Sequence, residues 1–247
     1  MAALSVKYRA IAFDLGGVLL DSEEAHEGAA RRAASDFNLS VPQEKWPRVR
    51  GGAYEDFFDQ LLALPANAGC RLRPMQIVLR AYDHYHEEIR RSARLFEGAI
   101  EVLESARAMF ASVTVATSSE WRLVETSLRH FNLAGYFDGV ISGDHVTQKK
   151  PAPEAFLVAA WLLGVSPASM VIVEDSTHGV RAARLARAHV IGLATSRSSQ
   201  ALREAGAHHV ALSHLDIVAY FDALKRSGHI GGRSAHRDAP HFLESTY

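Results

Sequence analysis

Two adjacent carboxylates, Glu174 and Asp175, follow directly after the apolar run 170–173. Carboxylates at the end of a buried strand are unfavourable unless a positive group lies nearby. Mg²⁺ would supply that charge, because it prefers oxygen ligands and is usually bound by one or two carboxylates together with phosphate oxygens. The pair therefore favours a magnesium site, although a solvated turn remains the alternative on this motif alone.

A third carboxylate, Asp14, ends the apolar run 10–13 and is followed by Gly16 and Gly17. Glycine allows the backbone to turn and to approach a ligand without a side chain in the way. Asp14 could therefore lie close to a substrate, but an ordinary turn from strand to loop is equally compatible with this segment.

Two further segments could bind an anion. Thr117 and Ser118 follow the run 113–116, just before a helical pattern. A hydroxyl group and the free N–H groups at the start of a helix can together form a phosphate cradle. An ordinary N-cap by Ser118 or Ser119 is the alternative. Lys150 precedes a proline, which favours an extended backbone there, so it could neutralise an anionic substrate or could belong to a solvated basic loop.

The elements that must position these residues alternate along the chain. Short apolar runs occur at 113–116, 140–141, 170–173, 190–193 and 210–212. Amphipathic segments separate them: Trp121, Val124, Leu128 and Phe131 share one helical face, as do Phe156, Ala160 and Leu163. This alternation predicts an α/β fold with a parallel sheet covered on both faces. Ligands of such sheets bind at the carboxyl ends of the strands, so the polar segments are expected to converge.

Residues 22–95 have a different character, since they are charged and helix-prone with no convincing β run. We interpret them as a helical cap inserted into an α/β core of residues 1–21 and 96–228. Residues 229–247 have little periodicity and are expected to form a loose tail.

The composition excludes some other classes of protein. Of the 247 residues, 48% are apolar, enough for a buried core, and the net charge of −1 favours neither nucleic acid nor a membrane surface as a partner. The single cysteine, Cys70, excludes an intramolecular disulfide and fits a reducing compartment. No signal peptide is recognisable, so a cytoplasmic monomer or homodimer is expected.

Taken together, these segments resemble the haloacid-dehalogenase-like superfamily, in the branch of phosphoglycolate phosphatase and beta-phosphoglucomutase. The resemblance covers residues 9–220 and rests on FDLGGVLLDSEEAH, LFEGAIEVL, VATSSE, GDHVTQKKPAPEAFL, LGVSPASMVIVEDSTHGVRAA and AGAHHV. It implies a Rossmann-like core with a helical cap that closes over a small phosphorylated metabolite.

The resemblance also implies individual roles. Asp14 would attack phosphorus to form an aspartyl phosphate. Thr117 and the backbone N–H of Ser118 would bind the phosphoryl group, and Lys150 would contact both Asp14 and that group. Mg²⁺ would be held by Asp14, Glu174, Asp175 and the backbone carbonyl of Gly16. In the cap, His26 matches a hinge histidine of beta-phosphoglucomutase, although an ordinary surface histidine is equally compatible.

The sequence departs from the family at Gly16, where the phosphatases have a second aspartate that serves as general acid and base. Magnesium binding is expected to survive this change, while acid–base catalysis is weakened. Asp21, Glu23, His26 or the substrate itself could supply the proton. Beta-phosphoglucomutase activity is not expected, because that enzyme needs the missing acid and base and because Tyr54 stands where it has an arginine that binds the distal phosphate. Arg48 and Arg50 lie nearby in the sequence, so an anionic distal group on the substrate remains possible.

The sequence thus predicts a magnesium-dependent phosphomonoester hydrolase of weak or specialised activity. The second hypothesis is a catalytically silent relative that binds a phosphometabolite. A dehalogenase is less well supported, because such enzymes lack the Glu174–Asp175 pair. A Schiff-base phosphonatase is less well supported too, because the one lysine of the insertion, Lys45, lies in a charged stretch flanked by prolines and is better explained as a solvated lysine.

Overall fold

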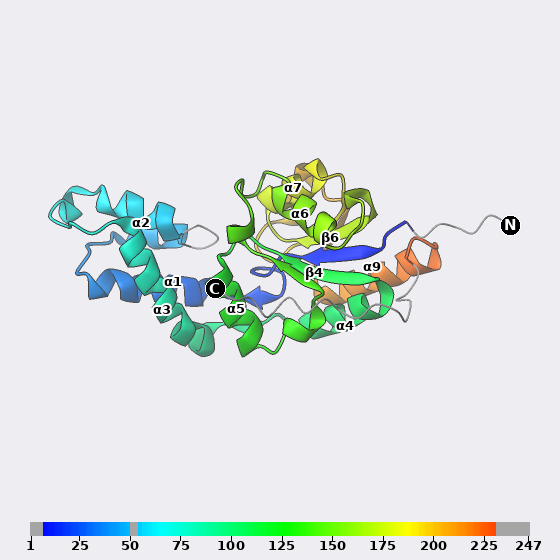
Figure 1. Ribbon diagram of the computed structural model, residues 1–247, viewed down its shortest axis with the longest axis horizontal. Coiled ribbons are helices and arrows are strands. Elements are labelled where there is room, and N and C mark those ends of the chain that lie inside the picture. Colours follow the sequence, from blue (N-terminus) through cyan, green and yellow to red (C-terminus); the bar gives the residue numbers. More distant parts are fainter. Residues whose placement is uncertain (1–6, 50–53, 231–247) are drawn as a thin grey trace. The chain divides into compact units, whose positions relative to one another are not determined.

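A computed structural model describes residues 7–49 and 54–230 of the chain, which form two compact units (Figure 1). Within these residues, the core unit comprises 7–19, 95–121 and 132–230, and the helical unit comprises 20–49, 54–94 and 122–131. Most of the predicted loose tail, from residue 231 onward, lies outside the described residues.

The core unit is built on a six-stranded sheet with the strand order β5-β4-β1-β6-β7-β8. Its strands are β1 (Ala10–Phe13), β4 (Ser112–Ala116), β5 (Gly139–Ile141), β6 (Met170–Glu174), β7 (His189–Leu193) and β8 (His209–Ala211). All of its neighbouring strands pair in parallel; Phe13 of β1, for example, lies between Val115 of β4 and Val173 of β6. The carboxyl ends of β4, β1 and β6 therefore meet at one edge of the sheet.

Helices cover both faces of this sheet (Figure 1), as the apolar runs predicted. They are α4 (Ala99–Met109), α6 (Glu154–Leu162), α7 (Thr177–Leu185), α8 (Ser199–Ala205) and α9 (His214–Arg226). Helices α6 and α7 lie on one face, and α4 and α9 on the other. Every residue of β1 and β6 is buried, which explains why these strands read as continuous apolar runs. The α/β fold predicted from the sequence is confirmed.

Short 3-10 helices complete the core unit: η3 (Ala134–Tyr136), η4 (Gly143–His145) and η5 (Pro167–Ser169). Serine side chains cap α7, α8 and α9, since the Ser176, Ser198 and Ser213 hydroxyls accept hydrogen bonds from backbone N–H groups of the first turn.

The helical unit contains α1 (Glu23–Asp36), η1 (Gln43–Arg48), α2 (Tyr54–Leu62), η2 (Pro65–Asn67) and α3 (Pro74–Ser92). Residues 122–131, which form most of α5 (Trp121–His130), also belong to this unit. A second sheet pairs β2 (Leu20–Asp21) with β3 (Arg94–Leu95). The sequence did not predict these two strands, because two residues are too few for a periodic pattern.

Small residues allow α1 and α3 to pack closely. Five alanines of α1 are buried, namely Ala25, Ala29, Ala30, Ala33 and Ala34. A β-carbon on Gly28 of the same helix would lie 2.8 Å from Oε2 of Glu88 on α3.

The helical face predicted for residues 121–131 is buried at Val124 and Leu128 of α5 but only half-buried at Trp121 and Phe131. Phe131 lies beyond the end of α5.

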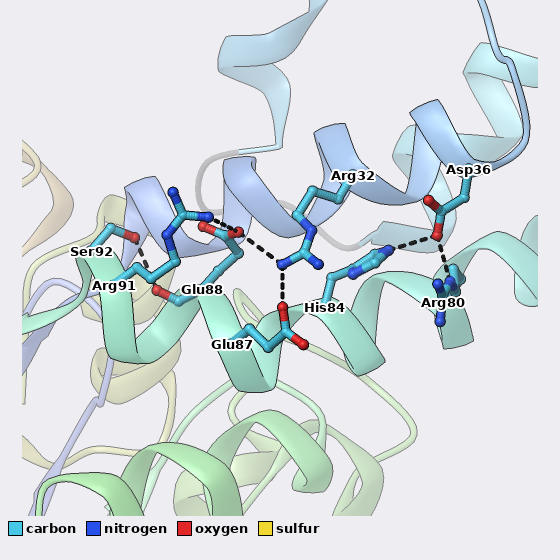
Figure 2. Close-up of polar contacts among 8 residues, drawn as sticks. All are labelled: Arg32, Asp36, Arg80, His84, Glu87, Glu88, Arg91 and Ser92. Atoms are coloured by element: carbon cyan, nitrogen blue, oxygen red, sulfur yellow. Dashed lines mark hydrogen bonds and ion pairs between the residues drawn. The ribbon is translucent and has the colours of Figure 1, made fainter.

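Polar contacts also join α1 to α3 (Figure 2). Arg32 donates to Glu87 at 2.6 Å and to the buried Glu88 at 3.2 Å, and Glu88 also accepts from Arg91. One turn further along α1, Asp36 accepts from Arg80 and contacts Nε2 of His84 at 2.7 Å. These pairs fix the register of the two helices.

No helix among the described residues is long and apolar enough to cross a membrane.

Candidate active site

Three of the polar segments found in the sequence lie at the carboxyl edge of the core sheet. Asp14 follows β1, Thr117 follows β4, Glu174 ends β6, and Asp175 follows it. Since β4, β1 and β6 are neighbours in the sheet, the strand order alone brings these residues to one place.

Lys150 comes from the loop before α6 and links this group. Its Nζ donates to Oδ1 of Asp14 at 2.6 Å, to Oε1 of Glu174 at 2.5 Å and to the carbonyl of Ala116 at 2.9 Å. Three acceptors use all three N–H bonds of an ammonium. The Lys150 side chain is only 6% exposed, so it does not belong to a solvated loop, whereas that of Lys149 is 46% exposed.

The Glu174–Asp175 pair is also enclosed. Glu174 is 1% exposed, and its Oε2 accepts hydrogen bonds from the backbone N–H and the hydroxyl of Ser176, at 3.2 and 3.0 Å. Asp175 is buried and accepts from the hydroxyl of Ser196. The solvated turn considered for this pair is therefore wrong.

Burial and mutual repulsion perturb the carboxylates. Burial raises the pKa of Asp14 to about 6, with a further contribution from Glu174, although Lys150 opposes the shift. Burial raises the pKa of Asp175 to about 8, helped by the negative charges of Glu174 and Asp14. Burial disfavours the charged form of Lys150, but Asp14 and Glu174 outweigh it and raise the Lys150 pKa. Three carboxylates thus face one ammonium, and the site has an excess of negative charge.

The residues present fit a divalent cation by charge and by donor type. Carboxylate and carbonyl oxygens are the ligands that Mg²⁺ prefers, and a cation would relieve the repulsion that adds to the effect of burial on these pKa values. Among the described residues, however, no three His, Cys, Asp or Glu side chains are arranged as a preformed metal centre. In this arrangement Lys150 bridges Asp14 and Glu174, and Asp175 accepts a hydrogen bond from Ser196.

The two glycines after Asp14 differ in what the backbone requires. Gly17 has a φ of 77°, and a β-carbon on it would lie 2.0 Å from Oδ2 of Asp175, so only glycine fits there. Gly16 is not among the positive-φ glycines, so its backbone conformation does not by itself require glycine.

The predicted phosphate cradle lies beside the carboxylates. Thr117 is 3% exposed, and its Oγ1 accepts a hydrogen bond from the Ser119 N–H at 3.3 Å, while Ser118 is half-buried. The first N–H of α5, on Trp121, donates to Asp144 at 2.5 Å. Asp144, rather than either serine, therefore takes the capping role at this residue.

The predicted substrate residues His26 and Tyr54 lie together in the helical unit. The Tyr54 hydroxyl donates to the His26 carbonyl at 3.0 Å and lies 3.3 Å from His26 Nδ1. The His26 ring also packs on Tyr85, with 4.7 Å between ring centroids, and burial lowers the pKa of His26 to about 4. Arg48 donates to Gln60, and Arg50 lies outside the described residues.

Sequence reasoning missed three supporting residues: Ser176 and Ser196, which bond the carboxylate pair, and Gly179. A β-carbon on Gly179 would lie 1.9 Å from the carboxyl carbon of Glu174. The strand-end signal could have found Ser196, which closely follows β7. No sequence signal distinguishes Gly179 from any other helical glycine.

A hollow in the helical unit, of about 500 Å³, does not compete as a phosphate site. It is lined by Asp21, Glu23, Glu24, Glu27, Gly28, Arg31 and Glu88. Five carboxylates against one guanidinium would repel a phosphate dianion.

Comparison with known proteins agrees with this fold. The family model of haloacid dehalogenase-like hydrolases matches residues 11–193. The chain belongs to this family, and the members that it resembles are phosphatases. A phosphorylated carbohydrates phosphatase of Thermotoga maritima is 32% identical over 209 residues, which are 80% of this chain and 91% of that protein.

Other relatives are similarly distant. The fructose-1-phosphate phosphatase YqaB of Escherichia coli is 28% identical, over 73% of this chain and 93% of its own length. SUPPRESSOR OF QUENCHING 1 of Arabidopsis thaliana is 29% identical over 81% of this chain, but the match spans only 19% of that longer protein. Among solved structures, a candidate beta-phosphoglucomutase of Thermotoga maritima has a TM-score of 0.70 and 27% identity, covering 87% of this chain and 99% of that one.

Proposed function

We propose that the protein is a Mg²⁺-dependent phosphomonoester hydrolase that acts on a small phosphorylated metabolite through an aspartyl phosphate at Asp14. The observation that carries the proposal is the Lys150 ammonium, which contacts both Asp14 and Glu174 at the carboxyl edge of the sheet. A nucleophilic carboxylate must be brought to a phosphate dianion, and two anions approach each other only where positive charge offsets their repulsion.

Each side chain then has a defined task. Lys150 holds Asp14 by Oδ1, which leaves Oδ2 to attack phosphorus. Thr117 and the backbone N–H of Ser118 bind the oxygens of the phosphoryl group. Asp14, Glu174, Asp175 and the Gly16 carbonyl would hold Mg²⁺, which supplies positive charge to the transferring phosphoryl group when bound.

The activity is weak or specialised, because Gly16 has no side chain to protonate a leaving alcohol. General acid–base assistance contributes about 10²–10⁴-fold to such reactions. The names of the relatives support phosphorylated sugars or phosphoglycolate as the substrate class. We expect His26 and Tyr54 to contact the substrate, in a cytoplasmic monomer or homodimer that binds neither nucleic acid nor membranes.

The test is Mg²⁺-dependent phosphate release from a panel of sugar phosphates, phosphoglycolate and an aryl phosphate. Turnover should disappear in Asp14→Asn and with chelator, and it should persist in Lys149→Met, whose lysine is largely exposed. Turnover that survives Asp14→Asn would reject the aspartyl-phosphate mechanism.

Gly16 favours a second candidate, a relative that binds a phosphometabolite without hydrolysing it. Isothermal titration with Mg²⁺ and each member of the panel distinguishes the two. Binding without any Asp14-dependent turnover would support this candidate against the first. A dehalogenase, by contrast, would be insensitive to chelator.

A further inference from the structure

The loop between β7 and α8, residues 194–198, is anchored at both of its ends. At its start, the backbone N–H of Thr195 donates to the carbonyl of Leu193 at 2.9 Å. This bond closes a three-residue turn, which is common where a strand ends. At its other end, the Ser198 hydroxyl caps α8. The side chains of Thr195 and Ser196 stand between these two anchors.

Both of these side chains are bonded to parts of the candidate active site. The Ser196 hydroxyl donates to Oδ2 of Asp175, and the Thr195 hydroxyl donates to the carbonyl of Gly17 at 2.5 Å. The two acceptors also lie against each other, because a β-carbon on Gly17 would lie 2.0 Å from the same Oδ2. All four residues belong to the core unit. The loop after β7 therefore bonds the segment after β6 and the segment after β1 at once.

Asp175 depends on this loop more than Glu174 does. Among the described residues, the Ser196 hydroxyl is the one hydrogen-bond donor to the Asp175 side chain, whereas both oxygens of Glu174 accept hydrogen bonds. The negative charges of Glu174 and Asp14 also repel that of Asp175. Ser196 therefore holds Asp175 by Oδ2 against this repulsion, and Oδ1 is left for a cation.

Resting on the Mg²⁺ site of the function proposed above, we propose that Ser196 and Thr195 are positioning residues of that site. Ser196 holds Oδ2 of Asp175 and so leaves Oδ1 for the cation. Thr195 holds the Gly17 carbonyl and with it the segment that carries Asp14. Hydrogen bonds to the ligands of a metal, made by residues that do not bind the metal themselves, contribute about 10–100-fold to metal affinity.

Titration calorimetry with Mg²⁺ in the absence of substrate tests these roles. In Ser196→Ala we expect the Kd for Mg²⁺ to rise about 10–100-fold, and Ser196→Thr, which keeps a hydroxyl, should restore most of the affinity. Thr195→Val should raise the Kd by about 10-fold. The matched control is Ser199→Ala, whose lost hydroxyl makes no hydrogen bond with the described residues, and its Kd should be unchanged. Urea unfolding without Mg²⁺ checks that every variant is folded.

Turnover of an aryl phosphate separates positioning of the metal site from general damage. Ser196→Ala should need about 10–100-fold more Mg²⁺ for half-maximal turnover, while kcat at saturating Mg²⁺ stays close to that of the unaltered protein. Loss of kcat at saturating Mg²⁺ with no change in the Mg²⁺ requirement would overturn the positioning role.

The calorimetric outcomes are distinct as well. Mg²⁺ binding in Ser196→Ala that is as tight as in the unaltered protein would overturn the positioning role and leave the phosphatase proposal intact. Equal losses in Ser196→Ala and Ser199→Ala would overturn it too, and unchanged affinity in Thr195→Val would reject the part assigned to Thr195. If the unaltered protein binds no Mg²⁺ and shows no turnover that depends on Asp14, the proposed function fails and the positioning role fails with it.

Discussion

The α-carbon of Gly179 faces the Glu174 carboxylate so closely that a methyl group there would lie 1.9 Å from the carboxyl carbon. Glu174 in turn contacts Lys150 at 2.5 Å. The position of a carboxylate at the centre of the candidate site therefore depends on a glycine in the first turn of α7.

Gly179→Ala should displace Glu174 and disrupt its contact with Lys150. We expect loss of Mg²⁺ binding by isothermal titration and a destabilisation of about 1–3 kcal/mol, the usual effect of overpacking. Gly135→Ala is the matched control, since a β-carbon there has no atom within 4 Å. Unchanged Mg²⁺ affinity in Gly179→Ala would show that Glu174 is not a ligand.

Replacing Lys150 by methionine should destabilise the protein strongly, because Asp14 and Glu174 would lose their shared cation while remaining buried. Breaking a buried ion pair costs about 3–5 kcal/mol. Urea unfolding without Mg²⁺ at neutral pH measures this loss.

The matched change for that experiment is Lys149→Met, which removes an exposed contact to Glu120 at 3.5 Å. It should change stability by less than about 1 kcal/mol. Similar losses in the two variants would contradict the central role given to Lys150.

His189 should make the protein less stable in mild acid. Its ring nitrogens contact the hydroxyls of Tyr8 at 3.1 Å and Tyr220 at 2.9 Å. Burial, with the charges of His208 and Lys7, lowers the pKa of His189 from 6.5 to about 4. Since the unfolded chain then binds the proton more tightly, this contribution is complete above about pH 6.5 and is lost as the pH falls toward 4.

Urea unfolding between pH 7 and pH 4 measures this contribution as a difference between variants. His189→Gln should show a shallower loss of stability than the unaltered protein, and a change at the exposed His130 should not. Parallel curves for His189→Gln and the unaltered protein would reject the assignment.

Two adjacent glutamates of α3 should differ in their importance, although both accept from Arg32 (Figure 2). Glu88 is buried, whereas the Glu87 side chain is 64% exposed. Glu88→Ala should cost about 1–3 kcal/mol, the range for hydrogen bonds to charged groups, and Glu87→Ala should cost less than about 1 kcal/mol. Thermal unfolding measures both, and equal effects would show that burial does not decide this network.

The sequence by itself determined the α/β class and the edge at which the site forms. Continuous apolar runs are typical of strands buried on both faces, and parallel strands must present their carboxyl ends together. Asp14, Thr117 and Glu174 could therefore be selected by their place after such runs. The proline after Lys150 marked its position, and the family motifs added its role; local spacing did not show that Lys150 is enclosed while Lys149 is exposed.

Only the tertiary structure decided which atoms meet. Lys150 lies 136 positions from Asp14 in the chain, and its three acceptors lie in or directly after β1, β4 and β6, so no local spacing could predict the contact. The need for glycine at position 179 arises in the same way, because it is set by the volume of Glu174 in the folded protein. Periodicity reports which face of an element is buried, whereas contacts between elements depend on strand order and packing distance.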